Sequence, residues 1–186
     1  MLMTAVLGCI DLATALLAIA AIAKIADPDA TAALLARGAL GIRIRRPRRA
    51  RLAARLVGAA ELAVVAAVVV GGAPAYGLLA ACYGLFVLIL AGVVRSGGAS
   101  CGCFGVRSAP PTRLHVGVNL FVAVLATVAA VESSPSLGDR LGDASVAAVS
   151  YLVFVGIGAA LLGAIFTSAA ELAPLLGTAR ARHTHE

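Results

Sequence analysis

Residues 52–94 read LAARLVGAAELAVVAAVVVGGAPAYGLLAACYGLFVLILAGVV, two long apolar runs separated only by Gly71-Gly72-Ala73-Pro74. A helix of about 20 mainly apolar residues spans the hydrocarbon core of a bilayer. The two glycines relax the backbone between the runs, and the proline suits the first turn of a helix. The stretch therefore predicts two antiparallel transmembrane helices, at 52–71 and 74–94.

The composition of the whole chain agrees with a membrane protein. Of the 186 residues, 61% are hydrophobic and 13% are charged, whereas soluble domains average roughly 45–50% apolar and about 25% charged residues. Further apolar runs predict helices at 2–26, 114–131 and 146–170, and all five are too long and too evenly apolar for barrel strands. The sequence predicts an all-α polytopic membrane bundle with five transmembrane helices.

The first apolar run resembles a secretory signal peptide in its position and in its Ala-x-Ala patterns. A signal peptide carries basic residues before a shorter apolar core, whereas Met1 to Ile22 contain no basic residue and include Asp11. We therefore expect a retained first helix.

The basic residues are distributed unevenly between the two sides of the expected bundle. Those on one side belong to the first loop and the start of the second helix, the third loop and the C-terminal tail: Arg37, Arg43, Arg45, Arg46, Arg48, Arg49, Arg51, Arg55, Arg95, Arg107, Arg113, Arg180 and Arg182. Arg140 alone falls on the other side. Because short cytoplasmic loops retain Arg and Lys, we expect a multi-pass protein of the cell membrane with its N-terminus outside and its C-terminus and third loop in the cytoplasm.

The Arg37–Arg55 segment has a second interpretation as a binding surface. Arginines next to a membrane attract anionic lipid headgroups, and arginine clusters also bind nucleic acid. No aromatic residues are interleaved to stack on bases, so we expect lipid headgroups and no nucleic acid. Thr31–Ile42 is expected to form a short interfacial helix with Arg37 toward the headgroups.

The sharpest local motif is Cys101-Gly102-Cys103-Phe104-Gly105, between the third and fourth transmembrane helices. Cysteines one residue apart can form a disulfide if the backbone turns, which Gly102 permits, and the small ring makes that disulfide easy to reduce. Nearby Arg95, Arg107 and Arg113 favour the reactive thiolate. A pair of inert thiols or of metal ligands remains an alternative, although two cysteines are too few for a closed zinc or iron–sulfur site, and we predict no metal.

Three ionisable residues fall inside the expected membrane spans, where an unpaired charge is costly. Glu61 shares a helix face with Gly58 and Ala54, so another helix can approach its carboxylate. Lys24 either pairs with Glu61 as a structural link or takes part with it in a proton relay. Asp11 lies about 140° around the first helix from Lys24 and has no evident partner.

Polar residues also begin the fourth transmembrane helix and lie within the first and third. His115 and Asn119 share one face, so His115 is a candidate proton carrier and Asn119 a candidate contact for a headgroup or a quinone-like ring; the alternatives are an interfacial histidine and a helix–helix hydrogen bond. Cys9 and Cys82 are either packing residues or a second redox pair. His183 and His185 are too few for a metal site.

The CGCFG string between two transmembrane helices, together with Lys24, Glu61, Arg95 and Asn119, resembles the MauE family within the DoxX-like group of redox-associated membrane proteins. The resemblance covers residues 1–131 and implies a four-helix membrane bundle that forms or transfers disulfides with a thioredoxin-like protein. For the methylamine-utilisation namesake, the implied client is the disulfide-rich small subunit of methylamine dehydrogenase. Such clients lie outside the cytoplasm, whereas the charge bias places Cys101 and Cys103 inside.

The remaining chain adds to this four-helix core. We expect residues 132–173 to form an outer loop and a fifth transmembrane helix that stops at Pro174, followed by a short basic, histidine-containing tail at 174–186. The leading functional hypothesis is a membrane thiol–disulfide oxidoreductase component with Cys101 and Cys103 as the redox pair and a quinone as its candidate cofactor. The alternatives are a small-solute or metal-ion carrier that uses Glu61, Asp11 and the cysteines as ligands, and a non-catalytic assembly subunit.

Overall fold

A computed structural model describes residues 2–38, 43–95, 112–142 and 145–182, with side chains given as far as residue 165. Its helices are α1 (Leu2–Ala26), α2 (Asp29–Arg37), α3 (Pro47–Val70), α4 (Gly72–Arg95), α5 (Arg113–Val131), α6 (Leu137–Leu141) and α7 (Val146–Arg182). Five segments are long and apolar enough to cross a membrane: α1, α3, α4, α5 and Val146–Ile165 of α7. The predicted all-α polytopic membrane bundle is confirmed.

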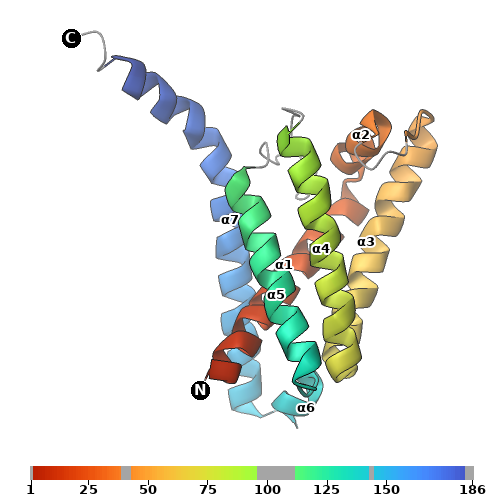
Figure 1. Ribbon diagram of the computed structural model, residues 1–186, viewed down its shortest axis with the longest axis vertical. Helices are drawn as coiled ribbons and strands as arrows, with labels where there is room; N and C mark the ends of the chain where they lie inside the picture. The colour runs from red at the N-terminus through yellow and green to blue at the C-terminus, as the bar shows by residue number, and fades with distance from the viewer. Residues whose placement is uncertain (1, 39–42, 96–111, 143–144, 183–186) are drawn as a thin grey trace.

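Helix α1 occupies the centre of the bundle. In Figure 1 it runs obliquely past α3, α4, α5 and α7, which stand roughly side by side, and it contacts α3, α5 and α7. Its spanning segment is 44% buried inside the protein, against 17–22% for the other four. The outer helices therefore present most of their surface to lipid, while α1 supplies the surface on which they pack.

The boundary between the two central apolar runs is tighter than predicted. Only Gly71 separates α3 from α4, its N–H bonds to the Ala67 carbonyl at 2.6 Å, and Gly72 takes a positive φ of 56°. Helix α3 begins at Pro47 rather than at residue 52, because a proline suits the first turn and arginines continue the helix beyond the membrane.

The end of α7 contradicts the prediction that the fifth helix stops at Pro174, since the helix continues to Arg182. A proline inside a helix removes one N–H donor and costs about 3 kcal/mol. The surrounding sequence Ala-Ala-Glu-Leu-Ala-Pro-Leu-Leu consists otherwise of strong helix formers, which favour continuation. Figure 1 shows this last part of α7 projecting beyond the other helices.

Two short helices close the ends of the bundle. The expected interfacial segment forms α2, which buries Ala32 and Leu35 against α3 and ends at Arg37 before Gly38, whose φ is 82°; residues 39–42 lie outside the description. An exposed Arg51–Asp29 ion pair of 2.6 Å joins α2 to α3 and contributes at most about 1 kcal/mol. Helix α6 lies within the segment that the sequence predicted as an outer loop.

The apolar core lies toward the end of the bundle where α1 begins. Ile10, Val68, Tyr76 and Leu79 are fully buried there, from α1, α3 and α4. The Tyr83 hydroxyl donates a hydrogen bond of 2.8 Å to the Ala13 carbonyl, which ties α4 to α1. Small residues of α5 complete the cluster, so α1, α3, α4 and α5 form one packed unit.

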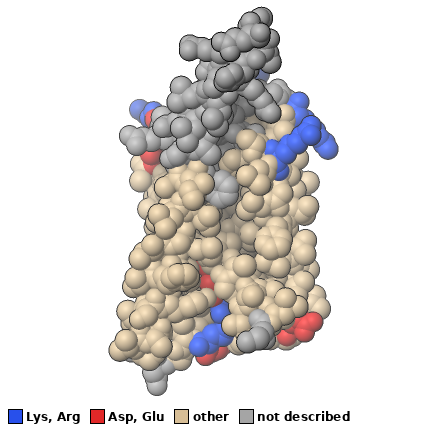
Figure 2. All heavy atoms as spheres, turned by 90° about the vertical axis from the view of Figure 1, so that its left-hand side faces the viewer, with Lys and Arg blue, Asp and Glu red and all other residues tan. Residues whose placement is uncertain are grey.

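Charged residues gather at the two ends of the molecule, with an apolar belt between them over most of the face in Figure 2. The N-terminus and α6 lie at one end, and α2, the last turn of α4, the first turn of α5 and the end of α7 lie at the other (Figure 1). We call the latter the arginine end, because the described arginines of these segments and of the start of α3 belong to it: Arg37, Arg43, Arg45, Arg46, Arg48, Arg49, Arg51, Arg55, Arg95, Arg113, Arg180 and Arg182.

Gly58 sets the distance between α1 and α3, and its substitution tests this packing. A Cβ atom at Gly58 would lie 2.8 Å from the Ala21 carbonyl oxygen and 2.9 Å from Ile25. We expect Gly58→Ala to lower the free energy of unfolding by about 1–3 kcal/mol, because the helices must move apart. Unfolding in mixed detergent micelles measures this loss. Gly77→Ala is the matched control, because nothing lies within 4 Å of its Cβ position; equal losses in both variants would contradict the close approach.

Candidate functional site

Two ion pairs anchor α1 inside the bundle, one toward each end; the first is fully buried and the second has a partly buried arginine. Lys24 of α1 pairs with Glu61 of α3, and Asp11 of α1 pairs with Arg140 of α6. Among the described residues, no three His, Cys, Asp or Glu side chains gather where they could hold a metal ion. Asp11 and Glu61 therefore belong to separate clusters with separate partners.

The Lys24–Glu61 pair lies beside the close approach of α1 and α3 at Gly58. The Lys24 Nζ and Glu61 Oε2 atoms are 2.7 Å apart, and the two residues are 4% and 3% exposed. Gly58 and Ala54 precede Glu61 on the same face of α3, and both are buried. The small residues let the α1 backbone reach α3, which brings the lysine to the carboxylate as the sequence suggested.

The second oxygen of Glu61 differs from the first. Oε1 is buried and has no hydrogen-bond partner among the residues that the structure describes. Beside the pair, the Lys24 ammonium lies 5.9 Å from the centre of the Phe86 ring, and that ring meets Tyr83 edge-on at 5.7 Å. The cluster therefore combines a cation, an aromatic ring and an unused carboxylate oxygen.

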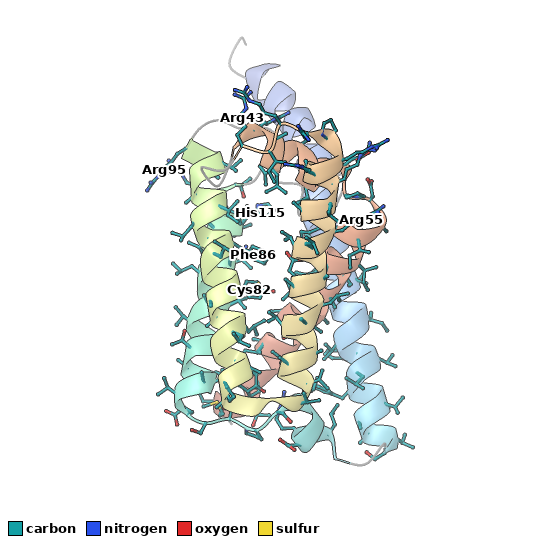
Figure 3. The ribbon with its side chains drawn as sticks, turned by 90° about the vertical axis from the view of Figure 1, so that its right-hand side faces the viewer. Arg43, Arg55, Cys82, Phe86, Arg95 and His115 are labelled. Carbon is teal, nitrogen blue, oxygen red and sulfur yellow. The ribbon has the colours of Figure 1, made fainter. Side chains whose placement is uncertain are left out.

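Residues from α4 and α5 face the same region. In Figure 3, Cys82 and Phe86 of α4 and His115 point into the space between α4 and α3, and Arg43 and Arg95 lie at the arginine end. The Cys82 thiol is close enough to Glu61 and Lys24 to interact electrostatically with both. We call Lys24, Glu61, Cys82 and Phe86 the central polar cluster.

His115 and Asn119 are both held by their own helix. The Thr112 N–H donates to His115 Nδ1 at 3.2 Å, and the Thr112 hydroxyl lies 2.9 Å from the same nitrogen. Because Nδ1 accepts a hydrogen bond, the neutral imidazole carries its proton on Nε2. The Asn119 amide donates to the His115 carbonyl at 2.7 Å, so this bond lies within α5 and joins no second helix.

The CGCFG motif, Cys101, Gly102, Cys103, Phe104 and Gly105, lies outside the described residues, as does Arg107. The elements on either side of it in the sequence are described: α4 ends at the exposed Arg95, and α5 begins at Arg113. These two helices pack along each other, and both ends belong to the arginine end. Cys9 and Cys82 are free thiols, the first exposed and the second partly buried.

The sequence analysis missed the partners of Asp11. Its Oδ1 accepts from Arg140 Nη2 at 2.6 Å, and its Oδ2 accepts from the Tyr151 hydroxyl at 2.5 Å. Burial by itself lowers the pKa of Arg140, but the hydrogen bond and charge of Asp11 outweigh it and raise that pKa. The guanidinium therefore stays charged and holds α6 and α7 against α1. The one available signal was that Arg140 is the sole basic residue predicted on the side where Asp11 lies.

Comparison with known proteins finds one family. The family model described as Methylamine utilisation protein MauE matches residues 2–132, which cover α1 to α5. No curated protein and no solved structure matches the chain.

A double-mutant cycle tests whether Lys24 and Glu61 act as one unit. Removing one member leaves the other charge buried without its partner, so we expect Lys24→Met and Glu61→Leu each to cost about 3–5 kcal/mol of stability. The double variant K24M/E61L removes both charges, and most of the loss should be recovered. Unfolding of the four proteins in mixed micelles gives the coupling free energy; a double variant that loses the sum of both single effects would contradict the pairing.

Proposed function

Since the chain belongs to the family of the methylamine utilisation protein MauE, we propose that it is the membrane component that exchanges disulfides in methylamine utilisation. Cys101 and Cys103 are the reacting pair, and a thioredoxin-like protein is the partner. The observation that carries this proposal is the Cys-Gly-Cys sequence between α4 and α5, in a chain whose described part has five membrane-spanning helices.

The exchange requires only the Cys101–Cys103 disulfide and a partner protein with two thiols. A thiolate of the partner attacks the Cys101–Cys103 disulfide, which forms a mixed disulfide and releases one cysteine as a thiolate. The second partner thiolate then attacks the mixed disulfide. The partner leaves with a disulfide, and the Cys101–Cys103 pair keeps the two electrons as a dithiol.

Basic residues that flank the motif in the sequence support this role. Arg95 ends α4 and Arg113 begins α5, so one arginine precedes the motif in the sequence and the other follows it. The N-terminus of α5 adds the partial positive charge of a helix dipole. Such surroundings lower the free energy of a thiolate relative to its thiol and so increase the reactive fraction.

We propose further that the arginine end faces the cytoplasm. The described arginines of α2, α3, α4, α5 and α7 share this end, whereas the opposite end has Arg140, which Asp11 neutralises. Retention of basic residues in the cytoplasm supports this orientation. The exchange partner of Cys101 and Cys103 is then a cytoplasmic thiol protein, and Arg37–Arg55 contacts anionic headgroups of the inner leaflet.

Trapping the mixed disulfide tests the exchange. In Cys103→Ser, Cys101 can still attack the disulfide of an oxidised partner, but this chain has no second thiol at the motif to complete the exchange and release a reduced partner. Only the partner's own freed thiolate can reverse the step, so we expect an adduct with the thioredoxin-like protein that acid quenching and alkylation preserve. Non-reducing electrophoresis followed by mass spectrometry identifies the partner and the linked cysteine. Cys9→Ser is the matched control, since its thiol is exposed on α1 far along the chain from the motif. An adduct that persists in Cys101→Ser/Cys103→Ser would contradict the assignment.

Labelling with a membrane-impermeant maleimide tests the orientation. In a variant whose only cysteine is Cys101, we expect labelling in inverted vesicles and protection in intact cells. A variant whose only cysteine is introduced by Glu132→Cys reports the opposite end, because Glu132 is exposed where α5 ends. We expect the reverse pattern for it, and labelling of Cys101 from outside would overturn the proposed orientation.

A further inference from the structure

The unused oxygen of Glu61 indicates that the central polar cluster is incomplete. A buried carboxylate oxygen without a donor is costly, because the group has lost its water and gained nothing in exchange. Glu61 Oε1 is in this state among the described residues, although Oε2 has a strong partner in Lys24. A ligand that donates a hydrogen bond to Oε1 would complete the site.

The neighbouring groups restrict what such a ligand can be. The Lys24 ammonium has three N–H donors, of which Glu61 Oε2 takes one at 2.7 Å and the Ala20 carbonyl takes one at 3.5 Å. A remaining N–H suits a carbonyl acceptor. The Phe86 ring lies beside the ammonium and offers a flat apolar surface. The site thus offers one acceptor (Glu61 Oε1), one donor (the Lys24 ammonium) and one aromatic ring (Phe86). These groups suit a planar ligand whose oxygen atoms accept a hydrogen bond as carbonyls and donate one as hydroxyls.

The location of the cluster indicates how the ligand arrives. Glu61 follows Arg55 by six residues on α3, which places it about 9 Å farther into the membrane. Helices α3 and α4 are joined at Gly71 and diverge toward the arginine end (Figures 1 and 3). Their outward faces are apolar, with Leu56 and Leu85 61% and 50% exposed. A ligand that reaches the cluster at this depth from the surrounding bilayer passes through the hydrocarbon region and is soluble in lipid.

We propose that the central polar cluster binds the headgroup of a lipid-soluble quinone, which reoxidises the Cys101–Cys103 pair. This proposal rests on the proposed function for its source of electrons. Conversion of the dithiol to a disulfide releases two electrons and two protons. The quinone takes up the two electrons and the two protons and becomes a hydroquinone. Lys24 donates to a quinone oxygen, and Glu61 Oε1 accepts the hydroxyl hydrogen of the hydroquinone.

This assignment differs from the sequence expectation, which placed a quinone-like ring at Asn119. The Asn119 amide nitrogen already donates to the His115 carbonyl. Cys82, by contrast, shares the side of α4 that faces α3 with Phe86 (Figure 3). The groups suited to a quinone headgroup therefore come from α1, α3 and α4.

Binding of menadione to the purified full-length protein in detergent tests the site without requiring any thiol chemistry. We expect saturable binding in equilibrium dialysis, weakened about tenfold or more in Phe86→Leu and in K24M/E61L. The double variant removes both charges together, which preserves folding better than either single change. Phe121→Leu is the matched control, because Phe121 is 57% exposed on α5, and it should bind as the wild type does. Equal binding in all four proteins, or no saturable binding to the wild type, would overturn the proposal.

A second measurement separates this site from the exchange function. Cys101→Ser/Cys103→Ser should bind menadione normally but reduce it no faster than dithiothreitol does without protein, whereas the wild type exceeds that protein-free rate. Normal binding with no reduction by the wild type would overturn the proposed reoxidation and leave a quinone-binding site that does not react with the cysteine pair. Trapped partner adducts without menadione binding would remove the site and leave the exchange function.

Discussion

Helix α1 carries a charged residue toward each end, and neither charge can face lipid. A charge at the centre of a bilayer costs at least about 2.5–3.5 kcal/mol, so each must find a partner inside the bundle. Asp11 and Lys24 are thirteen positions apart and point in directions that differ by about 140°. Their partners accordingly lie on different sides of α1: Glu61 on α3, and Arg140 with Tyr151 on α6 and α7. The need to pair both charges therefore determines how α1 is rotated about its axis and which helices pack against each of its sides.

The sequence predicted what depends on neighbouring positions in the chain. The five spans follow from run length, and the Lys24–Glu61 contact follows from small residues at Gly58 and Ala54 on the face of Glu61. Asp11 could not be paired, because Arg140 and Tyr151 are 129 and 140 positions away and no periodicity links them. The continuation of α7 through Pro174 was missed for another reason: one unfavourable residue was given more weight than the helix formers around it. The CGCFG motif, on which the functional prediction rests, lies outside the described residues.

The region that matches the family ends at residue 132, yet a buried residue within it depends on groups beyond it. Asp11 is 3% exposed, and both of its oxygens accept hydrogen bonds from residues that follow the match. Gly158 and Gly163 of α7 lie against Leu12 and Leu16 of α1. Helix α7 is therefore an integral part of this bundle and covers the side of α1 that the other three spanning helices, α3, α4 and α5, leave exposed.

The two carboxylates of the bundle show how a structural pair differs from a candidate binding site. Both Asp11 oxygens have donors, although the Nε of Arg140 is buried without a partner among the described residues, and the contribution of this pair is to hold α6 and α7 in place. Glu61 has a partner for one oxygen only, although it is equally buried. A protein that needed this pair only for packing would be expected to satisfy the second oxygen, as it does at Asp11, because an unpaired buried acceptor lowers stability. The unsatisfied acceptor lies beside Phe86, where α3 and α4 diverge. The pair that only holds helices together and the proposed ligand site therefore lie toward opposite ends of the same central helix.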